Sequence, residues 1–262
     1  MKTLRLILGD QLNAGHSWFS TIDPNVTYIL MEMRQETDYV AHHIQKIIAF
    51  FLSMRTFAAQ RQAAGHTVIY LPLDDLNNRP LLTENLLALI EKENITHFEY
   101  QLPDEFRLDA QLKSFCESLT ITSQAVDSEH FMSERHELED FFKGKKTYLM
   151  ESFYRYMRKK HRVMVDAKNE PWTGQWNYDA DNRSPFPKNH VATAPLLFSK
   201  DVTALLAMIQ SHGVKSIGTV DAKDFIWPTS RAEALELLGF FMKECLPLFG
   251  KFQDAIDRKS VV

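Results

Sequence analysis

Short apolar runs alternate with longer periodic segments through the first half of the sequence, and this alternation limits the folds open to the chain. A short apolar run favours a buried strand, whereas apolar residues spaced three and four positions apart favour a helix. Strands that alternate with helices predict βαβ units and a parallel sheet covered on both faces. The predicted strands are 3–9, 27–32, 67–71, 96–101 and 121–126. The sequence therefore predicts an α/β fold with a doubly wound five-stranded parallel sheet, followed by a helical extension.

The longest predicted helix runs from about Asp38 to Ala64, with Asp38 at its start and Gly65 after its end. After residue 130 the strand signals fade, and a loop at 166–197 contains five of the ten prolines. The other predicted helices are 81–92, 107–118, 131–143, 147–163, 200–211 and 229–247. We expect an α/β domain at 1–130, helices with a long interdomain loop at 131–198, and the start of a helical domain at 199–262.

Composition and charge exclude several classes of protein. The net charge of −4 gives no global attraction to nucleic acid or to an anionic membrane. Two cysteines, Cys116 and Cys245, are too few for a disulfide framework or a four-cysteine cluster. No apolar stretch approaches the ~18 residues of a membrane span, and Asp10 interrupts the amino-terminal apolar run. We expect a cytoplasmic protein without membrane contact and without a metal site.

Polar residues follow the first predicted strand, in the stretch LRLILGDQLN at residues 4–13. In an open parallel sheet, ligands bind beyond the carboxyl ends of the strands. Gly9 would permit close approach of a ligand, and Asp10 and Gln11 would offer hydrogen-bonding groups. The alternative is that Asp10 only forms an Asx-type turn, and position alone does not decide between the two.

Further polar residues follow the second and fourth predicted strands. Glu36, Tyr39 and His42 lie in RQETDYVAHHIQK, at residues 34–46, and would face the same sheet edge. The segment LPDEFRLD, at residues 102–109, reaches this edge too, although Asp104 and Glu105 also suit the start of a helix. The glycine-rich phosphate-binding motifs G-x-G-x-x-G and G-x-x-x-x-G-K-[ST] are absent.

One segment is strongly basic. MESFYRYMRKKHR, at residues 150–162, contains Arg155, Arg158 and Lys159 on a predicted helix, and such residues can contact phosphates. The alternative, which composition alone favours, is that they form a solvated helix face. The loop stretch GQWNYDADNRSP, at residues 174–185, adds Asn182 and Arg183 among aromatic residues that either stack on bases or anchor the loop.

Several of these segments together resemble the deoxyribodipyrimidine photolyase-related proteins, the bacterial iron–sulfur branch of the photolyase/cryptochrome superfamily. The resemblance rests on LILGDQL, YVAHHIQKIIAFFLSMRTFA, MESFYRYMRKK, WNYDADNRSP and FGKFQDAI, which occur in this order across nearly the whole chain. It implies an amino-terminal α/β domain that binds an antenna chromophore, 6,7-dimethyl-8-ribityllumazine in studied members. It also implies a helical domain that binds FAD and a [4Fe–4S] cluster and acts on a DNA photolesion.

The resemblance also implies roles for individual residues. Gly9, Asp10 and Gln11 match the loop that lines the lumazine pocket, and Glu36, Tyr39 and His42 match its second wall. Phe50 stands where the family often has a smaller aliphatic residue near the ring. The residues that match segments facing the catalytic half and its DNA are Arg155, Arg158, Lys159, Asn182 and Arg183.

The chain is expected to be the antenna half, because it ends where the helical domain would begin. FAD, the cluster and DNA contact are then expected only in the full-length protein. An exposed docking surface near 225–250 predicts some self-association. Two alternatives stay open: a nucleotide-binding protein or enzyme that uses Asp10, Gln11 and Glu36, and a nucleic-acid-binding protein that uses the 155–162 helix.

Overall fold

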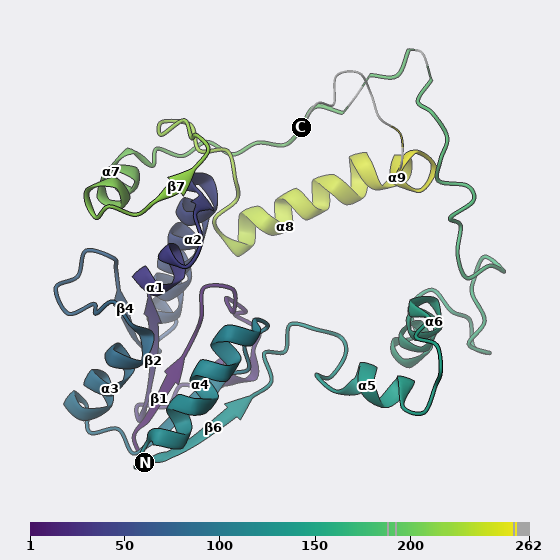
Figure 1. Ribbon diagram of the computed structural model, residues 1–262. Coiled ribbons are helices and arrows are strands. Elements are labelled where there is room, and N and C mark those ends of the chain that lie inside the picture. Colours follow the sequence, from purple (N-terminus) through teal and green to yellow (C-terminus); the bar gives the residue numbers. More distant parts are fainter. Residues whose placement is uncertain (188, 192, 254, 256–262) are drawn as a thin grey trace. The chain divides into compact units, whose positions relative to one another are not determined.

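The computed structural model describes residues 1–187, 189–191, 193–253 and 255. The chain forms two compact units. Unit 1 comprises Met1–His130 and Leu197–Ala234, and unit 2 comprises Phe131–Leu196 and Leu235–Val262. Figure 1 shows the helices and strands of both units. None of the helices formed by the described residues is both long enough and apolar enough to cross a bilayer.

Unit 1 is built on a five-stranded sheet in the order β4-β2-β1-β5-β6, in which every neighbouring pair is parallel. This confirms the predicted sheet, and β1 is its central strand, with Leu4 and Leu6 almost fully buried. The strands are β1 (Thr3–Leu6), β2 (Val26–Met31), β4 (Thr67–Leu71), β5 (His97–Gln101) and β6 (Thr122–Val126). A short 3₁₀ helix, η1 (Ser17–Phe19), precedes β2.

Helices cover both faces of this sheet, which makes it doubly wound, as predicted (Figure 1). On one face, α2 (Ile44–Ala63) packs Met54 and Phe57 against Tyr28 and Leu30 of β2 and against Ile7, which directly follows β1. On the other face, α3 (Leu82–Lys92) and α4 (Phe106–Ser118) pack against β1 and β5. The two layers leave the carboxyl ends of β1, β2 and β5 at one edge, where the sequence places its polar residues.

The predicted start of the long helix at Asp38 is wrong. A short helix α1 (Arg34–Asp38) is followed by the two-residue strand β3 (His42–His43), and α2 begins only at Ile44. His43 caps α2, because its Nδ1 accepts a hydrogen bond from the backbone N–H of Gln45 at 3.2 Å. The residues before Ile44 are extended because β3 pairs in parallel with β7 (Ser216–Ile217), a distant partner that local periodicity does not reveal.

Residues 197–234 fold back onto the outer side of α2. The helix α7 (Thr203–Ser211) packs Leu205 and Ile209 against Ile44 and Ile48. Gly218, just after β7, has a φ of +74°, and a Cβ there would lie 1.9 Å from Nε2 of His43. Only glycine therefore permits this close approach of the segment to α2.

Unit 2 contains most of the carboxyl-terminal helices. The helix α5 (Glu137–Phe142) is shorter than the predicted 131–143, whereas α6 (Met150–His161) lies within the predicted 147–163. The predicted helix 229–247 corresponds to α8 (Arg231–Phe240), which begins in unit 1 and ends in unit 2, then the π-helix η2 (Phe241–Cys245) and α9 (Leu246–Phe252). The described part of the loop at 166–197 forms no helix.

A buried carboxylate joins the elements around α2. Glu32, directly after β2, is fully buried, and its two oxygens accept hydrogen bonds from Arg55 of α2 at 2.6 and 3.0 Å. They also accept from the Tyr70 hydroxyl of β4 at 2.6 Å and from the Leu73 N–H at 2.8 Å. A buried charge is tolerated only when it is paired and fully hydrogen-bonded, and Glu32 meets both conditions.

Replacing Glu32 with Gln should reduce the free energy of unfolding by about 3 kcal/mol, because it leaves Arg55 without its charge partner. Urea unfolding followed by circular dichroism measures the loss. Asp38→Asn is the control, since its ion pair with Arg34 is exposed and should be worth less than about 1 kcal/mol. Equal losses in the two variants would contradict the importance given to Glu32.

Candidate functional site

Two neighbouring cavities open at the carboxyl end of β1. The edge cavity, of about 230 Å³, lies between the ends of β1 and β2, the start of α2 and the beginnings of α3 and α4. The outer cavity, of about 610 Å³, is more open and lies on the α2 side of the loop after β1. Both cavities are lined by Gly9, Asp10 and Phe50, so they meet at these three residues.

The walls of the edge cavity are mainly apolar. Side chains from both faces of the sheet contribute to them: Leu6, Leu8, Met31, Met33, Ile47, Phe51, Met54, Leu82 and Leu108. Such walls favour a flat apolar surface, and a few polar groups at the rim then fix the orientation of a ligand.

An ion pair forms one side of the polar rim. Glu36 accepts hydrogen bonds from Arg107 at 3.1 and 2.7 Å, and this bond raises the pKa of the Arg107 guanidinium. The guanidinium also lies 4.5 Å from the centroid of the Tyr39 ring and 3.1 Å from Glu105. These contacts hold Glu36 and Tyr39 in place beside the cavity. Both carboxylate oxygens of Glu36 already accept hydrogen bonds from Arg107.

The opposite side of the rim is formed by His42 and Lys46. Lys46 Nζ donates to His42 Nδ1 at 3.2 Å, and His42 Nε2 lies 3.1 Å from the carbonyl oxygen of Glu36. When Nδ1 accepts from Lys46, Nε2 can donate to this carbonyl oxygen, so both ring nitrogens have a partner. Tyr39 packs against the His42 ring with centroids 5.1 Å apart, so the rim is continuous from Arg107 to Lys46.

Gly9 is the residue where the chain comes closest to α2. A Cβ at this position would lie 3.0 Å from Met54 Sδ and 3.0 Å from a ring carbon of Phe50. A larger side chain would therefore displace Phe50, which lines both cavities, and Met54, which lines the edge cavity. The close neighbours of Gly9 are thus side chains of α2, and the approach of a ligand to Gly9 stays a prediction.

Asp10 lines both cavities, and the folded protein disfavours the ionised form of its carboxyl group. Its pKa is raised, chiefly because the surrounding protein removes part of its hydration, with smaller contributions from the negative charges of Asp104 and Glu36. His130, itself 3.8 Å from Asp104, opposes this effect. Asp10 is exposed at the rim of both cavities, and its carboxyl group has no ion-pair partner among the residues that the structure describes.

Gln11 has a different place from the other predicted pocket residues. It is buried, its Nε2 donates to the carbonyl oxygens of Gln101 and Leu102 at 3.1 and 3.4 Å, and its Oε1 accepts from the Leu8 N–H at 3.1 Å. Gln11 thus fixes the loop after β1 and lines neither cavity, whereas Gly9, Asp10 and Phe50 line both and Glu36, Tyr39 and His42 line the edge cavity.

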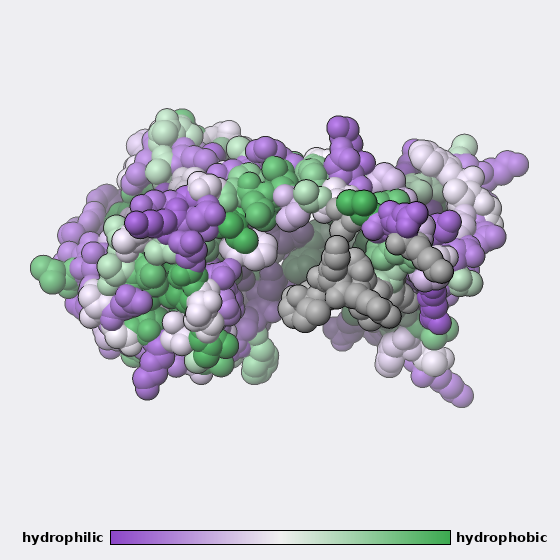
Figure 2. All heavy atoms as spheres, turned by 90° about the horizontal axis from the view of Figure 1, so that it is seen from above, coloured by the Kyte–Doolittle hydropathy of each residue, from purple (hydrophilic) through white to green (hydrophobic). Residues whose placement is uncertain are grey.

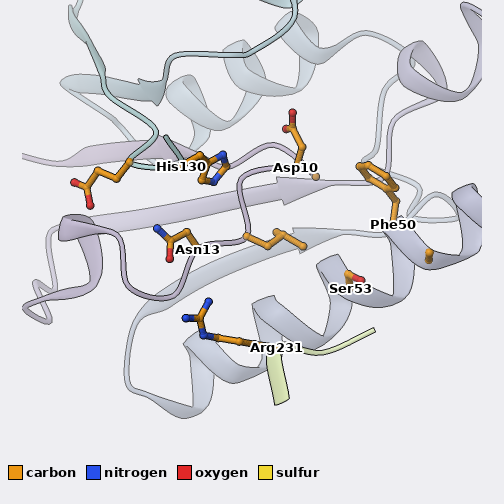
Figure 3. Close-up of a pocket in the computed structure, with 10 residues that line it drawn as sticks. Asp10, Asn13, Phe50, Ser53, His130 and Arg231 are labelled. Carbon is orange, nitrogen blue, oxygen red and sulfur yellow. The ribbon is translucent and has the colours of Figure 1, made fainter. Parts of the chain in front are cut away.

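Sequence reasoning did not identify several lining residues. Lys46 has a weak signal, since it lies four residues after His42 and one helical turn away. Ser53 has a weak signal too, because it lies three residues after Phe50 on the same helix. His130 and Arg231 have none, because a loop and the segment at 197–234 bring them to the outer cavity only in the folded chain. Figure 3 shows Asp10 and His130 on one side of this cavity, Phe50 and Ser53 on α2, and Arg231 extending toward Asn13.

The basic residues of α6 mostly bind within unit 2. Arg158 is buried and donates to the carbonyl oxygens of Val163 and Met164 at 3.2 and 2.6 Å, so it closes the end of α6. Arg155 pairs with Glu151. Arg155, Arg158 and Lys159 all lie within 5.0–5.5 Å of the Trp176 ring, which anchors the following loop.

The other two residues of the predicted contact set, Asn182 and Arg183, lie in the long loop that follows α6. Asn182 Nδ2 donates to Gln253 Oε1 at 3.0 Å, which joins the loop to the end of α9. Arg183 is exposed. Arg158 therefore stabilises the fold of unit 2. Arg155, Lys159 and Arg183 are the exposed cations of the predicted contact set.

Comparisons with known proteins give one family and one relative. The deoxyribodipyrimidine photo-lyase-related protein family matches residues 5–225. A curated protein of Agrobacterium fabrum (strain C58), named (6-4) photolyase, is 30% identical over 263 residues, which cover 98% of this chain and 50% of the relative. The chain thus spans about half the length of the curated relative it matches.

Replacing Asp10 with Asn should stabilise the protein slightly at pH 7, by a few degrees in Tm at most. The raised pKa means that the ionised carboxylate destabilises the folded state, so its cost is absent below the ordinary pKa of Asp and appears as the pH rises above it. Thermal unfolding at pH 4.5 and pH 7 tests this. The gain should be larger at pH 7, and a loss of stability at pH 7 would contradict it.

Proposed function

Because this chain belongs to the deoxyribodipyrimidine photo-lyase-related protein family, we propose that unit 1 binds an antenna chromophore of the ribityllumazine type. In the intact flavoprotein, this chromophore would absorb light and pass its excitation to the flavin for DNA repair or light sensing. The resemblance of the sequence to this family and the cavities at the sheet edge support the same assignment.

The observation that carries the proposal is the edge cavity itself. It lies at the carboxyl end of the central strand, with apolar walls from both helical layers and a rim of Asp10, Tyr39, His42 and Lys46. A lumazine ring is flat, with an apolar face and an edge that both donates and accepts hydrogen bonds. Asp10 and Lys46 supply groups of opposite charge for such an edge, and the aliphatic side chains supply a surface for its face.

The absence of a recognised catalytic set in the sequence agrees with this role. A bound antenna chromophore supplies the absorption of light, while the protein supplies orientation, rigidity and exclusion of water. The rim contacts from Arg107 through Tyr39 and His42 to Lys46 would provide this rigidity.

We propose that FAD and the [4Fe–4S] cluster are bound by other parts of the intact protein, and that DNA is contacted only in that context. A [4Fe–4S] cluster requires four cysteine ligands. Cys116 belongs to unit 1 and Cys245 to unit 2, so this chain supplies two cysteines. Arg155, Lys159 and Arg183 are the exposed residues that we propose for contact with the rest of that protein or its DNA.

The purified chain should bind 6,7-dimethyl-8-ribityllumazine, with a change in ligand fluorescence on titration. Gly9→Val should weaken this binding at least tenfold, because the new methyl groups would displace Phe50 and Met54 into the cavities. Gly239→Val is the control, since a Cβ at Gly239 meets no atom within 4 Å. Circular dichroism confirms that both variants are folded.

Three results would contradict this function. One is the lack of any lumazine binding by the folded chain, and another is unchanged affinity in Gly9→Val. The third is a larger thermal shift with AMP or ATP than with the lumazine, which would support a nucleotide-binding protein instead.

We also propose that the chain self-associates through exposed apolar side chains of its last helices. Leu235, Leu238, Met242, Leu246 and Phe249 recur at three- and four-residue spacing and are between 45% and 56% exposed. Figure 2 shows green hydrophobic residues among purple hydrophilic ones on the face that is seen, without identifying single residues. Sedimentation velocity should show a dimer whose fraction rises with concentration and falls in Leu238→Glu, and a monomer at all concentrations would contradict this.

A further inference from the structure

One part of the chain near the edge cavity has few buried contacts of its own. Residues 34–43, which we call the strap, comprise α1, β3 and the turn between them. Residues 38–41 in the middle of the strap are all exposed, and a segment with little apolar burial opens more easily than a packed sheet. Four residues of the strap line the edge cavity: Glu36, Thr37, Tyr39 and His42.

The two ends of the strap are held by different elements. At the first end, α1 is joined to α4, where Gln35 Nε2 donates a hydrogen bond to Gln111 Oε1 at 2.7 Å. At the second end, β3 forms a two-stranded parallel sheet with β7. The second end therefore depends on a segment that is distant in sequence.

Residues 212–227, which we call the clasp, contain β7 and are anchored on α2. Phe225 is almost fully buried in the apolar cluster that includes the first turns of α2. Gln45 of α2 donates to the carbonyl oxygen of Thr219 at 2.8 Å and accepts from Trp227 Nε1 at 2.6 Å. Both polar ends of this glutamine side chain are thus used to hold the clasp.

The clasp contacts the strap at α1 and at β3. Arg34 of α1 donates a hydrogen bond to the carbonyl oxygen of His212. In β3, consecutive side chains point to opposite faces, so His42 reaches the edge cavity while His43 lies against the clasp. A Cβ at Gly218 would lie 1.9 Å from the His43 ring, which makes this the tightest point of the contact.

We propose that the strap opens as a unit while the sheet stays folded, and that the clasp holds it closed. None of residues 212–227 lines either cavity, so the clasp acts on the edge cavity indirectly. A ligand in that cavity would meet the four lining residues of the strap only in the closed state. Ligand binding and the pairing of β3 with β7 then favour one another. This coupling rests on the proposed function, whereas the opening of the strap does not.

Hydrogen–deuterium exchange of the full chain without ligand tests the opening. Gly218→Ala drives a methyl group into the His43 ring, and peptides from the strap should exchange about tenfold faster while peptides from β1 and β5 stay unchanged. Gly144→Ala is the matched control. Gly144 has a φ of +76°, close to the +74° of Gly218, but a Cβ there meets no atom within 4 Å. Strap exchange in this control should equal that of the unaltered chain.

A second substitution separates the clash from a general loss of structure. His43→Ser removes the ring and keeps a side-chain oxygen that can cap α2. The double variant of Gly218→Ala and His43→Ser should therefore exchange more slowly in the strap than Gly218→Ala alone. Trp227→Phe serves if Gly218→Ala does not fold. It removes one hydrogen bond to Gln45 at a side chain that is 47% exposed, and should speed strap exchange about threefold.

The coupling is tested with saturating 6,7-dimethyl-8-ribityllumazine. The ligand should slow exchange in the strap and also at residues 216–219, which line neither cavity. Gly218→Ala should weaken lumazine binding about tenfold, and the double variant should regain most of the affinity. A clasp with a merely structural role would not respond to the ligand.

The outcomes separate this inference from the proposed function. Unchanged strap exchange in both Gly218→Ala and Trp227→Phe overturns the clasp. Equal acceleration in β1 and β5 overturns the local opening. A ligand that slows the strap but not residues 216–219 overturns the coupling, while the proposed function survives. If no lumazine binds, the proposed function and the coupling fail, and exchange without ligand still decides whether the clasp holds the strap.

Discussion

The ion pair between Glu32 and Arg55 is the constraint on which the sheet edge depends. Glu32 stands at the end of β2, and its four hydrogen-bond donors come from α2, β4 and the loop that follows β4. Nearby, Asn78 donates to the Glu32 carbonyl oxygen at 2.8 Å and ties the same loop to β2. A fully buried carboxylate that lost these donors would be costly, so the donors and their elements are held in one arrangement.

This arrangement sets the distance between β1 and α2, and the edge cavity lies in that space. Met54 precedes Arg55 by one residue, and Phe50 by five, so the contact of Arg55 with Glu32 also determines where their side chains meet Gly9. The outer side of α2 is held by an independent set of contacts, the apolar cluster with α7 and the pairing of β3 with β7. The helix that contributes to the lining of both cavities is therefore fixed on both sides.

The residues at the sheet edge differ from the core in their surroundings. The core around β1 is apolar and well packed, whereas Asp10 retains a carboxyl group where hydration is reduced and neighbouring charges are negative. Gln11, one residue later, has hydrogen bonds that serve the fold alone. Two adjacent polar residues thus serve different purposes, because one faces the cavities and the other faces the carbonyl oxygens at the end of β5.

The sequence by itself determined the five strands, their parallel arrangement and the edge near which Gly9, Asp10, Glu36, Tyr39 and His42 lie, whereas Phe50 was predicted there from the family resemblance alone. These follow from local periodicity and from the rule that parallel strands end at one edge, and both can be read along the chain. Only the tertiary structure decided that α2 begins at Ile44, since this depends on Ser216–Ile217, and that Arg158 is buried under its own loop. Arg231 likewise reaches the outer cavity through packing of α7 on α2, and a contact between residues so far apart leaves no local pattern in either segment.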